Sequence, residues 1–138
     1  MTAKDYLEQV KHMDVQIAFL EREIQRWRDM SVRVSGINYE SHNNSNRNTE
    51  ATYVKCLEKI DALEIKMKEK ISELVTLKSE VLDTLYAACT PEQRTVLVLR
   101  YIDNYDTEKI KAEVFRSDSW IYMTQKAGLD ALEAYLKK

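Results

Sequence analysis

Glycine and proline are scarce in this sequence, which has 2 glycines and 1 proline in 138 residues. β-Sheets and barrels depend on turns, and these two residues supply the backbone conformations that most turns need. Charged residues make up 32% of the chain, and long helix-forming side chains are common among the remainder. The sequence therefore predicts an all-α fold with long, exposed helices.

Long apolar runs are also missing, since no stretch approaches the roughly 20 residues that span a bilayer. The N-terminus lacks the continuous apolar core of a signal peptide, so we expect a soluble, cytoplasmic protein without a membrane partner. Cys56 and Cys89 lie far apart and form no CxxC motif, and neither His12 nor His42 has a partner at metal-ligand spacing. We predict neither a disulfide nor a metal site, and no cofactor.

The sequence contains no pattern that indicates an enzyme. It has no glycine-rich phosphate loop, no nucleophile elbow and no histidine placed near a cysteine or serine in a catalytic pattern. The formal net charge is −2, and residues 90–138 hold equal numbers of basic and acidic side chains. Such a balance exerts no general pull on nucleic acid, so any DNA-binding face must be local.

Residues 1–89 predict a long antiparallel helical hairpin of coiled-coil type. The first helix is expected over about 3–33, with apolar residues at alternating steps of four and three: Tyr6, Val10, Met13, Ile17, Leu20, Ile24 and Trp27. Asparagine and serine are frequent in residues 35–49, which predicts a loop. The second helix is expected over about 49–88, with a seam formed by Leu57, Ile60, Met67, Ile71, Leu74, Val81 and Leu85. A hairpin leaves apolar surface uncovered, so we expect a homodimer or another coiled-coil partner, or else coverage by the C-terminal part.

Residues 90–138 predict three shorter helices separated by tight turns. Thr90 is a suitable N-cap, followed by Pro91 at the first helical position and Gln93 to complete a capping box. Asn104 is suited to a left-handed conformation at the end of the first of these helices. Asp106 or Thr107 then caps a short second helix, and Ser117 caps the last one. Helices of these lengths and spacings form a helix-turn-helix unit.

This last stretch resembles region four of sigma-70-type RNA polymerase factors. It resembles more closely the small phage and prophage proteins built on that region, the RinA/ArpU-type late transcriptional regulators. The resemblance covers Thr90 to Leu136, and its matching residues are Pro91, Gln93, Arg94, Val96, Leu97, Leu99, Arg100, Tyr101, Ile110, Ser117, Ile121, Leu129 and Leu132. It implies a transcriptional regulator in a bacterial host cell that contacts promoter DNA and RNA polymerase. The family has glycine at the turn where Phe115 stands, and a more basic last helix.

Helical spacing predicts which side chains would meet DNA. If Ile121 and Gly128 face inward, the base-facing residues are Ser119, Tyr122, Met123 and Lys126. The expected phosphate contacts are Arg94, Arg100, Lys109, Lys111, Arg116 and Ser117. Two alternatives remain open. One is a protein-interaction module that modulates RNA polymerase or a sigma factor without touching DNA, and the other is a packaging protein of the small-terminase kind.

Overall fold

The computed structural model describes residues 1–37 and 43–138, and no β-strand occurs in these ranges. The elements in chain order are α1 (Ala3–Ile37), α2 (Asn43–Ala88), α3 (Pro91–Leu97), η1 (Val98–Ile102), α4 (Thr107–Val114) and α5 (Asp118–Leu136). η1 is a single π-helical turn. The all-α prediction is confirmed. Both long helices extend into the segment 35–49, where a loop was predicted, and positions 38–42 of that segment lie outside the described residues.

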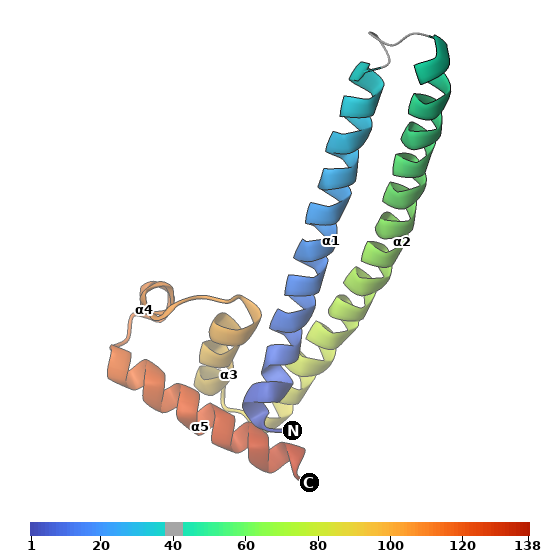
Figure 1. Ribbon diagram of the computed structural model, residues 1–138. Helices are drawn as coiled ribbons and strands as arrows, with labels where there is room; N and C mark the ends of the chain where they lie inside the picture. Colours follow the sequence, from blue (N-terminus) through green and yellow to red (C-terminus); the bar gives the residue numbers. More distant parts are fainter. Residues whose placement is uncertain (38–42) are drawn as a thin grey trace. The chain divides into compact units, whose positions relative to one another are not determined.

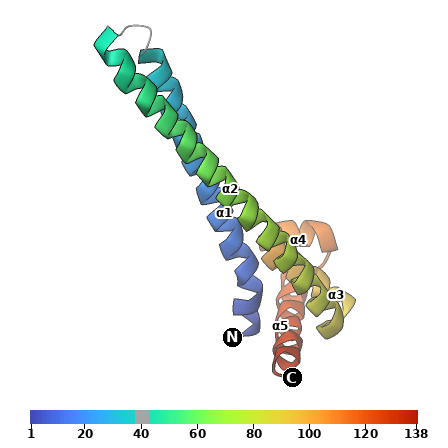
Figure 2. The same cartoon turned by 90° about the vertical axis from the view of Figure 1, so that its right-hand side faces the viewer.

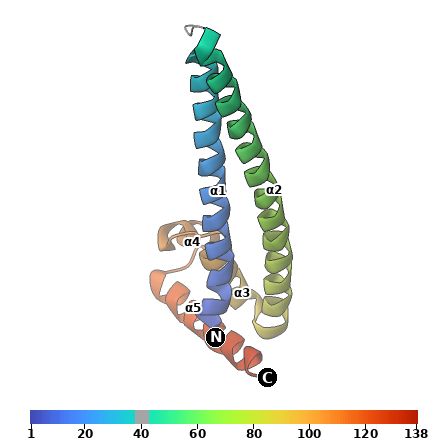
Figure 3. The same ribbon diagram turned by 45° about the vertical axis from the view of Figure 1, so that its right-hand side comes forward.

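The chain divides into two compact units, one comprising Val15–Ser72 and the other Met1–Asp14 with Glu73–Lys138. In the Val15–Ser72 unit, parts of α1 and α2 run side by side in opposite directions (Figures 1 and 3). Ile17, Leu20 and Ile24 of α1 and Cys56 and Ile60 of α2 are buried there. Neither helix can bury an apolar stripe alone, so this pairing supplies the unit with its core.

The buried stripe of α2 agrees with the predicted seam at Ile60, Leu74, Val81 and Leu85 and differs from it at Leu57 and Ile71. The buried residues of α2 are Cys56, Ile60, Leu74, Val81 and Leu85, whereas Leu57 and Ile71 lie on the flank of this stripe and are 45% and 40% exposed. Glu64 lies on the same flank, and its carboxylate accepts a hydrogen bond of 2.7 Å from Arg28 on α1. Glu64 therefore pairs with the other helix at the edge of the core.

The second unit contains the start of α1, the end of α2 and all the shorter helices. Its α1 and α2 segments bury Leu7, Val10, Val81 and Leu85. They are also joined by a 3.1 Å hydrogen bond between the hydroxyls of Tyr6 and Thr84.

The short helices α3, α4 and α5 lie together in this unit (Figures 1 and 2). Their shared core consists of three fully buried side chains, Val96, Ile110 and Ile121, one from each helix. Partly buried Leu99, Tyr105, Val114 and Trp120 pack against it. A core drawn from all three helices orients α5 through its buried side and leaves the other side to solvent.

The caps of the short helices agree with the sequence. Thr90 and Gln93 form both hydrogen bonds of a capping box at the start of α3. Asp106 caps α4, since its carboxylate accepts the backbone N–H of Lys109 at 2.9 Å. Asn104 has φ 58°, the left-handed conformation expected of it.

Candidate nucleic-acid interface on α5

Helix α5 has a buried side and an exposed side. The buried residues are Ile121, Gly128 and Leu132. A Cβ at Gly128 would lie 3.0 Å from Cδ1 of Leu97 and 3.2 Å from Cβ of Gln93, so α3 and α5 meet at this position. The exposed residues include all four that were predicted to face bases, namely Ser119, Tyr122, Met123 and Lys126.

The turn that leads into α5 has an unusual backbone. Phe115 adopts φ 56° and ψ 45°, the left-handed region, and its N–H donates to the carbonyl of Lys111 at 2.9 Å. Its side chain is 86% exposed. A residue with a Cβ is disfavoured in this conformation. Phe115 thus holds a turn conformation that glycine would adopt without this cost.

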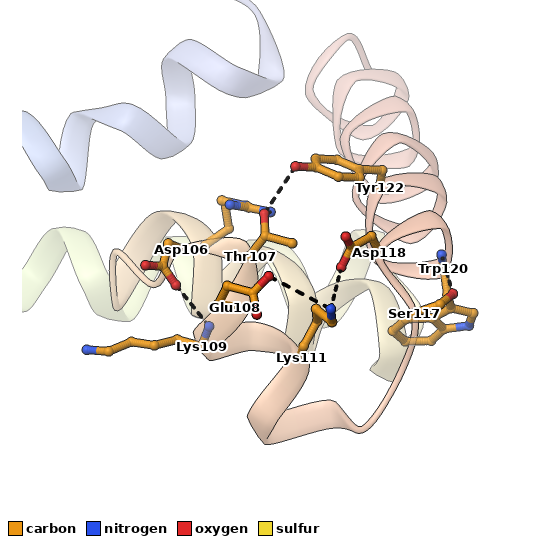
Figure 4. Close-up of polar contacts among 10 residues, drawn as sticks. Asp106, Thr107, Glu108, Lys109, Lys111, Ser117, Asp118, Trp120 and Tyr122 are labelled. Atoms are coloured by element: carbon orange, nitrogen blue, oxygen red, sulfur yellow. Dashed lines mark hydrogen bonds and ion pairs between the residues drawn. The ribbon is translucent and has the colours of Figure 1, made fainter.

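The first turn of α5 is stabilised by Ser117. Its hydroxyl accepts the backbone N–H of Trp120 at 3.2 Å (Figure 4). Ser117 was predicted to contact phosphate, and in the protein its oxygen is engaged as the helix cap. A hydroxyl at this position satisfies one of the free N–H groups of the helix start.

A hydrogen-bonded network joins η1, α4 and α5 around Arg100. The guanidinium of Arg100 donates to the side-chain oxygen of Gln125 and to the hydroxyl of Thr107, both at 3.0 Å. The Thr107 hydroxyl in turn lies 3.1 Å from the hydroxyl of Tyr122 (Figure 4). Gln125 donates to the Tyr101 hydroxyl at 3.4 Å. The two bonds from Arg100 are charge-assisted and therefore stronger than neutral ones. Tyr122 is oriented by its neutral contact with Thr107 and by the guanidinium of Arg100, whose carbon lies 5.9 Å from the centroid of its ring.

Three of the residues predicted to contact phosphate are engaged within the protein. Arg94 stacks on the ring of Tyr86, with its guanidinium carbon 3.8 Å from the ring centroid, and Arg100 belongs to the network above. Lys111 forms an ion pair of 3.1 Å with Asp118. The hydrogen bond and charge of Asp118, with Glu108 nearby, raise the pKa of Lys111.

Three other cations of α4, α5 and the turn between them remain exposed. Lys109 lies 5.1 Å from the ring centroid of Tyr105, and Arg116 lies 5.1 Å from that of Trp120. Lys126 has no hydrogen bond, ion pair or ring contact within the described part of the chain. These three side chains can reach phosphates without breaking a contact to an acidic group.

Sequence reasoning did not identify the polar partners of this network: Tyr101, Thr107 and Gln125. Gln125 offers a signal, because it stands four residues after the buried Ile121 and therefore near the inward side of α5. A polar side chain at such a position calls for an internal partner. Which partner it meets depends on the fold of the three helices.

The described part of the chain contains neither a cluster of metal-binding side chains nor a membrane-spanning helix. Across residues 1–37 and 43–138, no three His, Cys, Asp or Glu side chains gather where they could hold a metal ion. No helix in those ranges combines the length and the apolar character needed to cross a membrane. Cys56 and Cys89 are free and buried. No protein-family model, curated protein or solved structure matches the chain.

Proposed function

We propose that the protein regulates transcription by binding promoter DNA through α3, η1, α4 and α5, arranged as a helix-turn-helix of the sigma region-four type. Its main support is that α5 buries one side against α3 and α4 and exposes Ser119, Tyr122, Met123 and Lys126 on the other. The major groove of DNA is wide enough to admit one such helix. In this proposal the protein works in the cytoplasm of a bacterial host, as phage and prophage regulators do, and has no enzymatic activity.

The exposed cations determine how the protein would hold the phosphate backbone. Lys109 of α4, Arg116 of the turn before α5 and Lys126 of α5 are exposed, and phosphate contacts from such residues position a helix in the groove. Three contacts are few for one protein molecule. A second copy would double them, and we propose that the long helices serve for dimerisation or for contact with RNA polymerase.

The long helices have apolar surface available for this second role. In the Val15–Ser72 unit, Val15 and Phe19 of α1 are 57% and 52% exposed, and they line a groove together with Lys66 of α2. Exposed apolar side chains that gather in this way are typical of protein-binding surfaces.

Binding to fragments of the DNA around the protein's own gene tests the proposal. Each phosphate contact lowers log K by about 0.9 per tenfold rise in salt. Between about 50 and about 200 mM salt, the three contacts of one copy predict a loss of about 40-fold in affinity, and the six contacts of a dimer predict about 1,800-fold. Arg116→Glu with Lys126→Glu should abolish binding. The control is Lys55→Glu with Lys59→Glu, which replaces two exposed cations of α2 and changes the net charge by the same amount. This control variant should still bind the DNA fragment specifically. Equal loss in both double variants would assign the effect to net charge, and unchanged binding in the first would remove α5 from the interface.

The second candidate is a protein-interaction module whose helix-turn-helix does not bind DNA. It is favoured by the internal use of Arg94, Arg100 and Lys111 and by the even charge balance of residues 90–138. Its partner would be RNA polymerase or a sigma factor. Salt dependence distinguishes the two candidate functions, because the affinity for purified polymerase should fall much less with salt than an affinity that depends on phosphate contacts. Polymerase binding without any DNA binding would favour this candidate.

A further inference from the structure

Helix α5 has few side chains that read guanine or adenine by paired hydrogen bonds. Arginine or lysine usually recognises guanine in this way, and asparagine or glutamine recognises adenine. The sequence of α5 contains neither arginine nor asparagine, and its one lysine, Lys126, is the one residue of the helix that could bind a guanine edge in place of a phosphate. Its one glutamine, Gln125, accepts from Arg100 and donates to Tyr101 within the network, so its amide is not available to a base.

The centre of the exposed side of α5 is apolar. Met123 is 72% exposed and stands beside Tyr122, which is 56% exposed. The hydroxyl of Tyr122 lies 3.1 Å from that of Thr107, and the guanidinium of Arg100 lies 5.9 Å from the centroid of its ring, so two contacts orient the tyrosine before binding. Lys126 lies one turn beyond Met123, and Arg116 precedes the helix. Cations therefore precede and follow the apolar pair along the chain, where they could contact phosphates while the pair faces base edges.

Thymine is the base whose major-groove edge suits this surface, because its C5 methyl group is the one apolar feature that unmodified base pairs display there. We propose that α5 selects its DNA sites by thymine methyl groups, with Met123 as the specificity-determining residue and the ring of Tyr122 beside it. This inference rests on the proposed DNA binding and names the base feature that the same surface reads.

The size of the effect follows from the area of one methyl group. Removing one methyl that is buried against Met123 should lower affinity about fourfold, which is about 0.8 kcal/mol at 1.4 kcal/mol per factor of ten. Uracil makes this change and no other, since it keeps every hydrogen-bonding group of thymine. The experiment therefore isolates the methyl contact from base pairing and from phosphate binding.

The test begins with selection of binding sites from random-sequence duplexes by the full-length protein. Each thymine of a selected site is then replaced in turn by uracil, and affinity is measured for the wild type and for Met123→Ala. At one or two positions, we expect about fourfold weaker binding by the wild type and no further loss by Met123→Ala. Met123→Leu should retain most of the thymine preference. Met30→Ala, which removes another exposed methionine from α1, should behave as the wild type does.

Salt dependence and selection separate the possible failures. Met123→Ala should keep the wild-type salt slope, because methionine contacts no phosphate. Selected sites that bind equally well with uracil at every position would overturn the thymine inference alone and leave the proposed function standing. No enrichment of any sequence would overturn both.

Discussion

Replacing Phe115 by glycine should stabilise the unit that contains α5. The left-handed conformation of Phe115, with φ 56°, costs a residue with a Cβ about 1–2 kcal/mol. Glycine removes this penalty but adds about 0.5–1 kcal/mol of unfolded-state entropy. The phenyl ring is 86% exposed, so its removal forfeits little buried area. We expect a net gain of about 0.5–1 kcal/mol in the free energy of unfolding.

Urea unfolding followed by the fluorescence of Trp120 measures this gain. A Trp27→Phe background leaves Trp120, which packs on the core of the short helices, as the single tryptophan. Phe115→Ala keeps the left-handed strain and should change stability by less than about 0.5 kcal/mol. Asn104→Gly, at φ 58°, should gain less than Phe115→Gly because asparagine tolerates this region. Equal stabilisation by Phe115→Ala and Phe115→Gly would refute the reasoning, since the gain would then come from loss of the exposed ring.

Three further changes probe the same unit. Gly128→Ala places a methyl 3.0 Å from the buried Leu97. Overpacking should outweigh the better helix propensity of alanine and lower the free energy of unfolding by up to about 2 kcal/mol. A higher free energy of unfolding in a urea titration would mean that α3 and α5 can separate. Arg100→Met removes two hydrogen bonds from a charged donor and should cost about 1.5–3 kcal/mol, whereas an unchanged urea midpoint would contradict the network. Burial raises the pKa of the Cys89 thiol, so the folded state holds the neutral form, and stability should fall as pH rises above the thiol's unfolded value of about 8.5. Cys89→Ala should remove that part of the alkaline loss, and an identical pH profile would exclude Cys89 as its source.

Features that depend on neighbours along the chain could be predicted from the sequence. The capping box at Thr90, the cap at Ser117 and the left-handed Asn104 are all present. The two caps join a side chain to backbone groups within a few residues, and the conformation of Asn104 belongs to a single residue, so a short stretch of sequence is enough to predict them. Helical periodicity likewise separated the inward Ile121 from the outward Met123.

Features that depend on which helices meet could not be predicted in this way. Several apolar rows on α2 have nearly the same spacing, and only packing placed Leu57 on the flank while burying Cys56. The same limit applied to the cations, because the charge of Arg100 can be read from the sequence and its partner Gln125, 25 residues further along the chain, cannot.

The sequence by itself therefore determined the all-α class, the caps and the two sides of α5, since short-range hydrogen bonds and the 3.6-residue period govern them. The tertiary structure decided that Arg100 and Lys111 are engaged internally while Lys126 is exposed. It also decided that Tyr122 is held by Thr107. These pairings arise when the common core of α3, α4 and α5 brings distant residues within hydrogen-bonding distance, and such distances are set by packing.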